Sequence, residues 1–80
     1  MWGQPWAEAH YEAALESSRR IGARPQLART QRAYAQMLLA DESAATEERR
    51  RARELLTEAQ ATARELGLNR LLEQVRQVEA

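Results

Sequence analysis

Apolar residues recur at three- and four-residue steps over residues 52–68, and this spacing predicts one stripe of an amphipathic helix. The stripe contains Ala52, Leu55, Leu56, Ala59, Ala63 and Leu66. Gly67 follows directly, which is typical of a helix that ends in a left-handed cap. Residues 7–23 have the same design and reach Gly22 in the same way. We therefore expect two similar helices, each of which packs its stripe against other parts of the chain.

Shifting one stretch onto the other brings similar residues together in the helix and in the turn that follows it. The shift pairs Ala7 with Ala52, Tyr11 with Leu56, Ala14 with Ala59, Arg19 with Arg64, Ile21 with Leu66, Gly22 with Gly67 and Leu27 with Leu72. Because the helix body, the helix end and the start of the next helix all agree, the pattern indicates an internal duplication.

Turn and cap residues divide the chain into four helices within a single domain, residues 1–80. We expect these helices at about 5–21, 25–40, 44–66 and 69–79. Pro5 and Pro25 suit the first turn of a helix, where the missing N–H leaves no bond unmade. Ser43 or Thr46 could cap the third helix with a side-chain oxygen. The short connection at Gly22 predicts an antiparallel helical hairpin.

Four helices joined by short turns predict an all-α fold with antiparallel neighbours. Our first expectation is two stacked helical hairpins, and the alternative is an up-down four-helix bundle. The second helix has an apolar stripe made of Leu27, Thr30, Tyr34, Met37 and Leu38, and Arg29, Arg32 and Gln36 lie off that stripe. The fourth helix has the most apolar stripe, made of Leu68, Leu71, Leu72, Val75 and Val78. Other parts of the protein must therefore cover the fourth helix.

The charges and the absence of cysteine exclude several classes of function. The 12 arginines balance 12 acidic residues, so no net charge favours nucleic acid or an anionic membrane. The densest basic cluster, Arg49–Arg51 with Arg53, is surrounded by glutamates and contains no aromatic residue for base stacking. We therefore do not expect nucleic-acid binding. No apolar run is long enough to span a bilayer and no signal peptide precedes the first helix, so we expect a cytoplasmic protein.

We expect neither catalysis nor a metal or cofactor site. His10 is the single histidine, and its neighbours offer no converging set of metal ligands. Glu54 and Glu58 could form an acid–base pair, but they lie among arginines on a face that should be solvated. No serine, threonine or histidine set suggests a nucleophile with its base. We predict that the protein is not an enzyme.

The spacing of Ala7, Tyr11 and Ala14, repeated as Ala52, Leu56 and Ala59, resembles the second helix of a tetratricopeptide repeat. The segments HYEAALESSRRIGARPQLART and RARELLTEAQATARELGL are also similar to the degenerate helical repeats at the end of MalT-like, LuxR-type bacterial regulators and related signalling ATPases. This resemblance implies a fragment of an α-solenoid. It also implies that the repeats sense ligands or partners, while ATP hydrolysis and DNA binding occur in domains that this sequence does not contain.

From these observations we expect a non-catalytic helical-repeat module for protein–protein interaction, as a fragment or small relative of a bacterial transcriptional or signalling regulator. The resemblance would place the second and fourth helices on the concave side, which makes Arg29, Arg32 and Gln36 candidate partner contacts. The alternative is a small helical-bundle protein that self-associates and has no ligand-binding role. Because repeat arrays bury their core by stacking, we expect one apolar flank to seek a protein partner or a second copy. Trp2 and Trp6 could close an end of the stack or contact missing sequence.

Overall fold

The computed structural model contains four α-helices and no strand over the residues that it describes, 5–40 and 42–79. They are α1 (Pro5–Ile21), α2 (Arg24–Ala40), α3 (Thr46–Leu66) and α4 (Asn69–Glu79). The prediction of an all-α fold is therefore confirmed. None of these helices is both long and apolar enough to cross a membrane. The side chains of Trp2 and Trp6, for which the sequence suggested two roles, lie outside the described residues.

The turns after α1 and α3 are built in the same way, as the duplicated sequence predicts. Gly22 and Gly67 both adopt the left-handed conformation, with φ of 73° and 70°. In each turn the residue after the glycine donates a backbone hydrogen bond into the last helical turn: Ala23 N–H to the Ser18 carbonyl at 3.0 Å, and Leu68 N–H to the Ala63 carbonyl at 2.8 Å. These bonds satisfy carbonyl groups that the helix end leaves free. The same local chemistry therefore closes both helices.

The start of α3 differs from the sequence-based expectation. We expected Ser43 or Thr46 to cap this helix, but Ala45 occupies the cap position in an extended conformation. Its backbone N–H donates to the Glu48 carboxylate at 2.9 Å. An alanine is tolerated here because Glu48 reaches back from the first turn, where the helix dipole also favours its negative charge.

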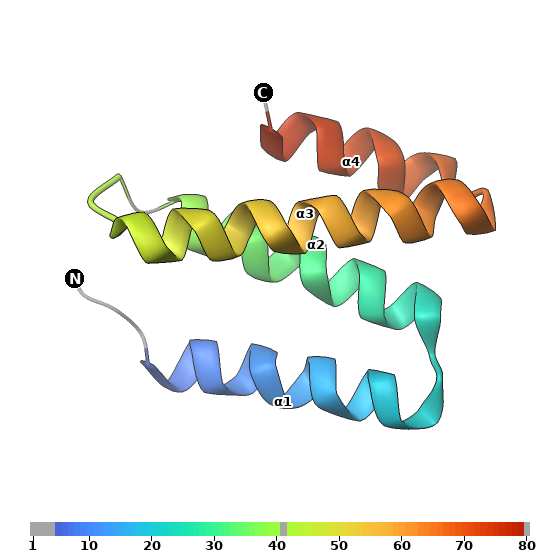
Figure 1. The fold of residues 1–80 in the computed structure, drawn as a ribbon, viewed down its shortest axis with the longest axis horizontal. Helices are drawn as coiled ribbons and strands as arrows, with labels where there is room; N and C mark the ends of the chain where they lie inside the picture. The colour runs from blue at the N-terminus through green and yellow to red at the C-terminus, as the bar shows by residue number, and fades with distance from the viewer. Residues whose placement is uncertain (1–4, 41, 80) are drawn as a thin grey trace.

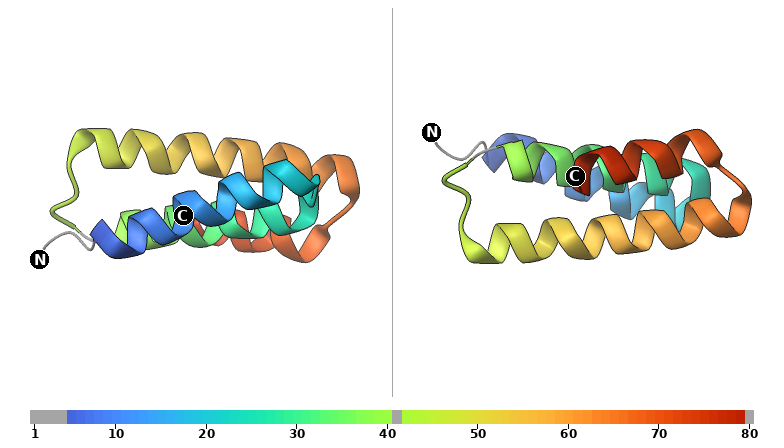
Figure 2. Two further views of the ribbon diagram at one scale, coloured as in Figure 1. Left: turned by 90° about the horizontal axis from the view of Figure 1, so that it is seen from below. Right: turned by 90° about the horizontal axis from the view of Figure 1, so that it is seen from above.

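The helices form a central pair with one further helix on either side (Figure 1). α2 and α3 pack against each other along most of their length, α1 packs on α2, and α4 packs on both α3 and α2. α1 and α4 lie on opposite sides of the pair and do not pack together within the described part of the chain. In both views of Figure 2, α3 runs along one edge of the molecule, and α1, α2 and α4 lie along the other edge.

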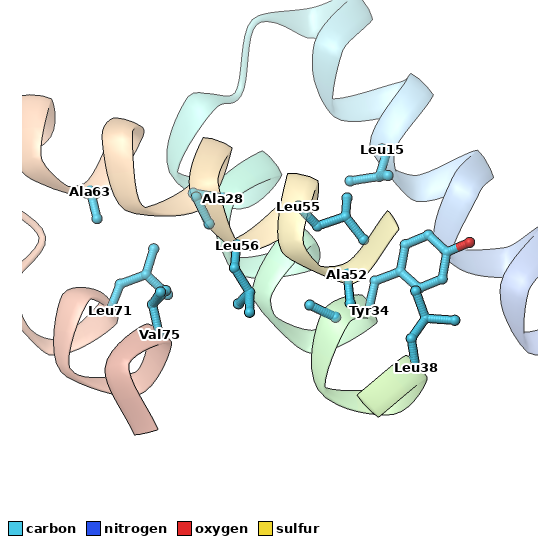
Figure 3. Close-up of a cluster of buried hydrophobic side chains, with 12 residues drawn as sticks. Leu15, Ala28, Tyr34, Leu38, Ala52, Leu55, Leu56, Ala63, Leu71 and Val75 are labelled. Carbon is cyan, nitrogen blue, oxygen red and sulfur yellow. The ribbon is translucent and has the colours of Figure 1, made fainter. Parts of the chain in front are cut away.

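The core lies mainly between α2 and α3 (Figure 3). Small residues on both helices are fully buried there, namely Ala28 and Ala35 on α2 and Ala52, Ala59 and Ala63 on α3. Small side chains let two helix backbones approach closely, so the larger side chains can interdigitate around them. Those larger residues are Leu15, Tyr34, Leu38, Leu55, Leu56, Leu71 and Val75.

The apolar flank expected from the sequence is absent from the described residues. Leu71 and Val75 of α4 are buried in the core, and Leu68, Leu72 and Val78 pack against it. Only two large hydrophobic side chains in this part of the chain are more than one-third exposed, Ile21 at 73% and Leu66 at 38%. α4 therefore finds its cover within the chain.

Replacing either cap glycine should destabilise the fold by a similar amount. Because no atom beyond the flanking residues lies within 4 Å of the position that a methyl group would take at Gly22 or Gly67, the cost of Gly22→Ala or Gly67→Ala comes from the left-handed backbone alone. We expect each variant to lose about 1 kcal/mol of unfolding free energy in urea denaturation. Gly67→Asn should lose less, because asparagine tolerates this conformation better. Equal stability of wild type and both alanine variants would contradict the cap assignment.

Candidate interaction groove between α2 and α4

Two adjoining hollows lie between α2 and α4 and together form a continuous groove. One hollow has a volume of about 480 Å³ and is lined by Arg32, Gln36, Leu39, Ala40, Gln74, Gln77 and Val78. The other has a volume of about 350 Å³ and is lined by Arg29, Arg32, Leu68, Asn69, Arg70, Leu71 and Gln74. Because Arg32 of α2 and Gln74 of α4 line both hollows, these two residues mark the middle of the groove. We call the whole surface the α2–α4 groove.

The helical repeat explains why these side chains meet. Arg29, Arg32 and Gln36 follow one another at three- and four-residue steps, so they lie along one face of α2. A different face of the same helix, which includes Ala28 and Ala35, is buried in the core. All three candidate contacts named from the sequence therefore lie on the α2 wall of one groove.

The opposite wall comes from α4 and was not anticipated from the sequence. Leu71 and Val75 anchor α4 in the core, and this orientation turns Arg70 and Gln74 toward α2. The sequence shows that these residues lie off the apolar stripe of α4. It does not show that α4 lies beside α2, because that placement depends on packing between helices distant in sequence.

The described residues give the groove a positive charge. Arg29, Arg32 and Arg70 line it, and none of the other described lining residues is acidic. None of these three arginines forms an ion pair with another described residue, whereas Arg19, Arg24 and Arg51 each pair with a glutamate. α2 contains three arginines and no acidic residue at all. The formal neutrality of the chain therefore conceals a basic surface along α2.

The guanidinium group of Arg32 makes a hydrogen bond within α2, but not all of its donors have an acceptor among the described residues. Its Nη1 donates to Oε1 of Gln36 at 2.6 Å, one helical turn further along α2. Its Nε is shielded from solvent and has no hydrogen-bond acceptor among the described residues. A guanidinium group has five N–H donors in a fixed plane, and the bond to Gln36 uses one of them.

The basic cluster on α3 is used within the fold. Arg49 donates to the backbone carbonyls of Glu42 at 2.9 Å and Ala44 at 3.4 Å, which ties the preceding loop to the helix. Arg50 lies 3.8 Å from Glu47, and Arg51 lies 3.2 Å from Glu12 on α1. These contacts engage Arg49, Arg50 and Arg51, and Arg53 is the exposed member of the cluster.

The residues considered for catalysis do not converge on one site. His10 is exposed and lies edge-on to Tyr11, with ring centroids 6.0 Å apart. Glu58 accepts a hydrogen bond from Nε2 of Gln31 at 2.7 Å, and Glu54 lies 3.8 Å from Arg51. Among the described residues, no group of three or more histidine, aspartate or glutamate side chains is placed to hold a metal ion.

A third, smaller hollow of about 210 Å³ lies where α1, α2 and α3 meet. Here the hydroxyl of Tyr34 donates to Oε2 of Glu12 at 2.9 Å, and the ring of Tyr34 stacks on Tyr11 with centroids 5.1 Å apart. Arg51 bonds the same carboxylate from α3 at 3.2 Å. The sequence placed Tyr34 in an apolar stripe but did not reveal this hydrogen-bonded role. The cluster fastens α1 to the central pair.

Burial shifts the titration of two groups in this cluster. Burial, followed by the hydrogen bond and the negative charge of Glu12, raises the pKa of Tyr34 to about 12. Burial, followed by the charge of Glu48, raises the pKa of Glu8. In both cases burial and the nearby glutamates favour the protonated, uncharged form of the side chain.

The tyrosine shift predicts a loss of stability in alkali. In the unfolded chain Tyr34 ionises near pH 10, while the folded state keeps its proton to about pH 12. The folded state therefore binds more protons in this window, and the free energy of unfolding should fall as pH rises through it. The chain has no lysine to titrate there. Denaturation at several alkaline pH values should show this decline in wild type and in Tyr11→Phe, but not in Tyr34→Phe. An equal decline in Tyr34→Phe would contradict the assignment.

No protein-family model matches this chain, and neither do the curated proteins or the solved structures with which it was compared. The assignment of a function therefore depends on the geometry and chemistry of the chain itself.

Proposed function

We propose that this chain is a non-catalytic helical-repeat module that binds a protein partner through the α2–α4 groove. The observation that carries the proposal is the groove itself, where long polar side chains from two helices face a common space. Arg29, Arg32 and Arg70 have no ion-pair partner among the described residues, and Gln74 lies between the two hollows. Side chains of this kind form hydrogen bonds across protein interfaces, in which arginine is enriched.

The equivalence of the two turns supports a repeat architecture similar to tetratricopeptide repeats. Gly22 and Gly67 end their helices with the same set of hydrogen bonds, so α2 and α4 follow equivalent turns. These two equivalent helices also lie side by side. Such an arrangement is expected when helical hairpins stack, and stacked repeats commonly use the face made by equivalent helices for binding.

The chemistry of the groove favours binding over catalysis. Its ionisable side chains are arginines, which stay protonated at any physiological pH. Acid–base catalysis needs a group that exchanges a proton near neutral pH. Asparagine, glutamine and aliphatic residues supply the rest of the lining, and they contribute hydrogen bonds and contact area.

We further propose that the module is a fragment or small relative of a cytoplasmic bacterial transcriptional or signalling regulator. This part of the proposal depends on the resemblance of the helical segments to the repeats of MalT-like regulators. ATP hydrolysis and DNA binding would then belong to other domains, and the module would report partner binding to them.

Self-association is the second candidate, and it is favoured by two exposed apolar side chains. Ile21 and Leu66 precede the two cap glycines and are 73% and 38% exposed. A helical protein that forms oligomers without binding another ligand would bury them. Sedimentation of wild type and of an Ile21→Ser/Leu66→Ser double variant at micromolar concentration distinguishes the partner-binding module from the self-associating protein. The proposed module sediments as a monomer in both forms.

Selection of short random peptides displayed on phage tests the proposal. We expect selected peptides to bind wild type and to lose affinity by at least about tenfold in Gln74→Trp, because the indole would fill the middle of the groove. Arg53→Trp, which places the same side chain on the exposed face of α3, is the matched control and should bind like wild type. Circular dichroism verifies that both variants are folded. Failure to select any peptide, or equal binding to both variants, would contradict the proposal.

A further inference from the structure

We propose that the occupant of the α2–α4 groove is an acidic segment of a protein partner, whose aspartate or glutamate side chains pair with Arg29, Arg32 and Arg70. This inference rests on the proposed function and specifies the chemistry of the partner. It follows from three properties of the groove: its charge, the state of Arg32 and the placement of its apolar ends.

The charge of the groove demands an anionic partner. Arg29 and Arg32 lie on one wall and Arg70 on the other, and the part of the lining that the structure describes contains no acidic residue. Several arginines elsewhere pair with a glutamate, as Arg24 does with Glu65 and Arg51 with Glu12, whereas the groove brings three arginines without an ion pair among the described residues to one hollowed surface. Three unpaired cations in one groove raise the local positive potential, and a complementary negative segment would lower it.

Arg32 is prepared to bind a carboxylate. The hydrogen bond to Gln36 fixes the guanidinium in the groove and uses an acceptor that carries no charge. The unpartnered Nε leaves one donor of the planar fork unsatisfied. A carboxylate accepts two parallel hydrogen bonds from the adjacent nitrogens of such a fork, and one bound beside Arg32 would compete with the neutral Gln36 for its donors.

The spacing of the arginines suits an extended segment with acids at alternate positions. Arg29 and Arg32 are separated by about 4.5 Å along the helix axis, given a rise of about 1.5 Å per residue. Alternate residues of an extended peptide lie about 6.6 Å apart and point to the same side. Flexible arginine side chains accommodate this difference, while Arg70 approaches from the opposite wall.

The ends of the groove favour a peptide over a nucleic acid. Leu39 and Val78 line one hollow, and Leu68 and Leu71 line the other. These aliphatic groups would pack against apolar side chains that flank the acids. Among the described lining residues there is no aromatic side chain on which a base could stack. The lining thus fits a segment that mixes acidic and apolar residues.

The test compares two labelled peptides that differ only in charge. One alternates glutamate with leucine, and the other has glutamine in place of each glutamate. We expect fluorescence anisotropy at low salt to show at least about tenfold tighter binding of the glutamate peptide, and binding that weakens as salt is added. Arg32→Ala and Arg70→Ala should each reduce affinity by about fivefold or more. Arg53→Ala, which removes an exposed arginine on α3, should leave affinity unchanged.

A second variant keeps all the arginines and the fold. Gln36→Glu places a carboxylate one turn from Arg32, where it would form an internal ion pair. We expect this variant to unfold at the same temperature as wild type or slightly higher, and to bind the glutamate peptide at least about fivefold more weakly. Unchanged affinity in Gln36→Glu would overturn the role given to Arg32.

The outcomes separate this inference from the proposed function. Equal binding of the glutamate and glutamine peptides would overturn the acidic partner, as would phage-selected peptides without acidic residues. In both cases the groove would still bind peptides and the interaction module would stand. A single-stranded oligonucleotide of equal charge that binds as tightly as the glutamate peptide would also overturn the inference, because the groove would then attract any polyanion. Competition by the glutamate peptide against the phage-selected peptides would support it.

Discussion

α2 and α3 pack together along a seam of buried alanines, and the positions of the other two helices follow from this contact. Ala28 and Ala35 contribute from α2, and Ala52, Ala59 and Ala63 contribute from α3, all without exposed surface. Two leucines of α3, Leu55 and Leu56, are also buried, and each such side chain contributes about 1.5–3 kcal/mol on leaving water. With α2 and α3 fixed, α1 has one helix to pack on and α4 has two.

α2 connects the core to the proposed function because one of its faces is buried in the core and another lines the groove. One face supplies Ala28, Ala35, Leu38 and Tyr34 to the core, and the hydroxyl of Tyr34 donates to Glu12 of α1 at the edge of that face. Another face carries Arg29, Arg32 and Gln36 into the groove. Because α2 packs against neighbours on several sides, its remaining polar face must contact either solvent or another molecule. The absence of acidic residues from α2 leaves this face strongly basic.

Helix ends and helix faces could be predicted from the sequence because they depend on local spacing. Gly22 and Gly67 marked two helix ends, and the common face of Arg29, Arg32 and Gln36 followed from helical periodicity. Contacts between distant segments could not be predicted in this way. Arg70 and Gln74 complete the groove only because Leu71 and Val75 anchor α4 beside α2.

Buried polar residues were also beyond the sequence pattern. Gln31 is 2% exposed and donates to Glu58 across the α2–α3 interface, although its polar side chain excluded it from the apolar stripe predicted for α2. Periodicity identifies apolar stripes, whereas a buried amide depends on a partner supplied by another helix. The sequence indicated that the apolar stripe of α4 must be covered, but not that α3 and α2 would cover it.

Amide hydrogen exchange, measured residue by residue under native conditions, tests the central place of the α2–α3 seam most directly. If this contact supports the fold, the amides around Ala35 and Ala59 should exchange only through global unfolding and show the greatest protection. Amides of α1 and α4 should exchange faster, through local detachment of either helix. Greater protection in α1 or α4 than in the α2–α3 pair would contradict this account.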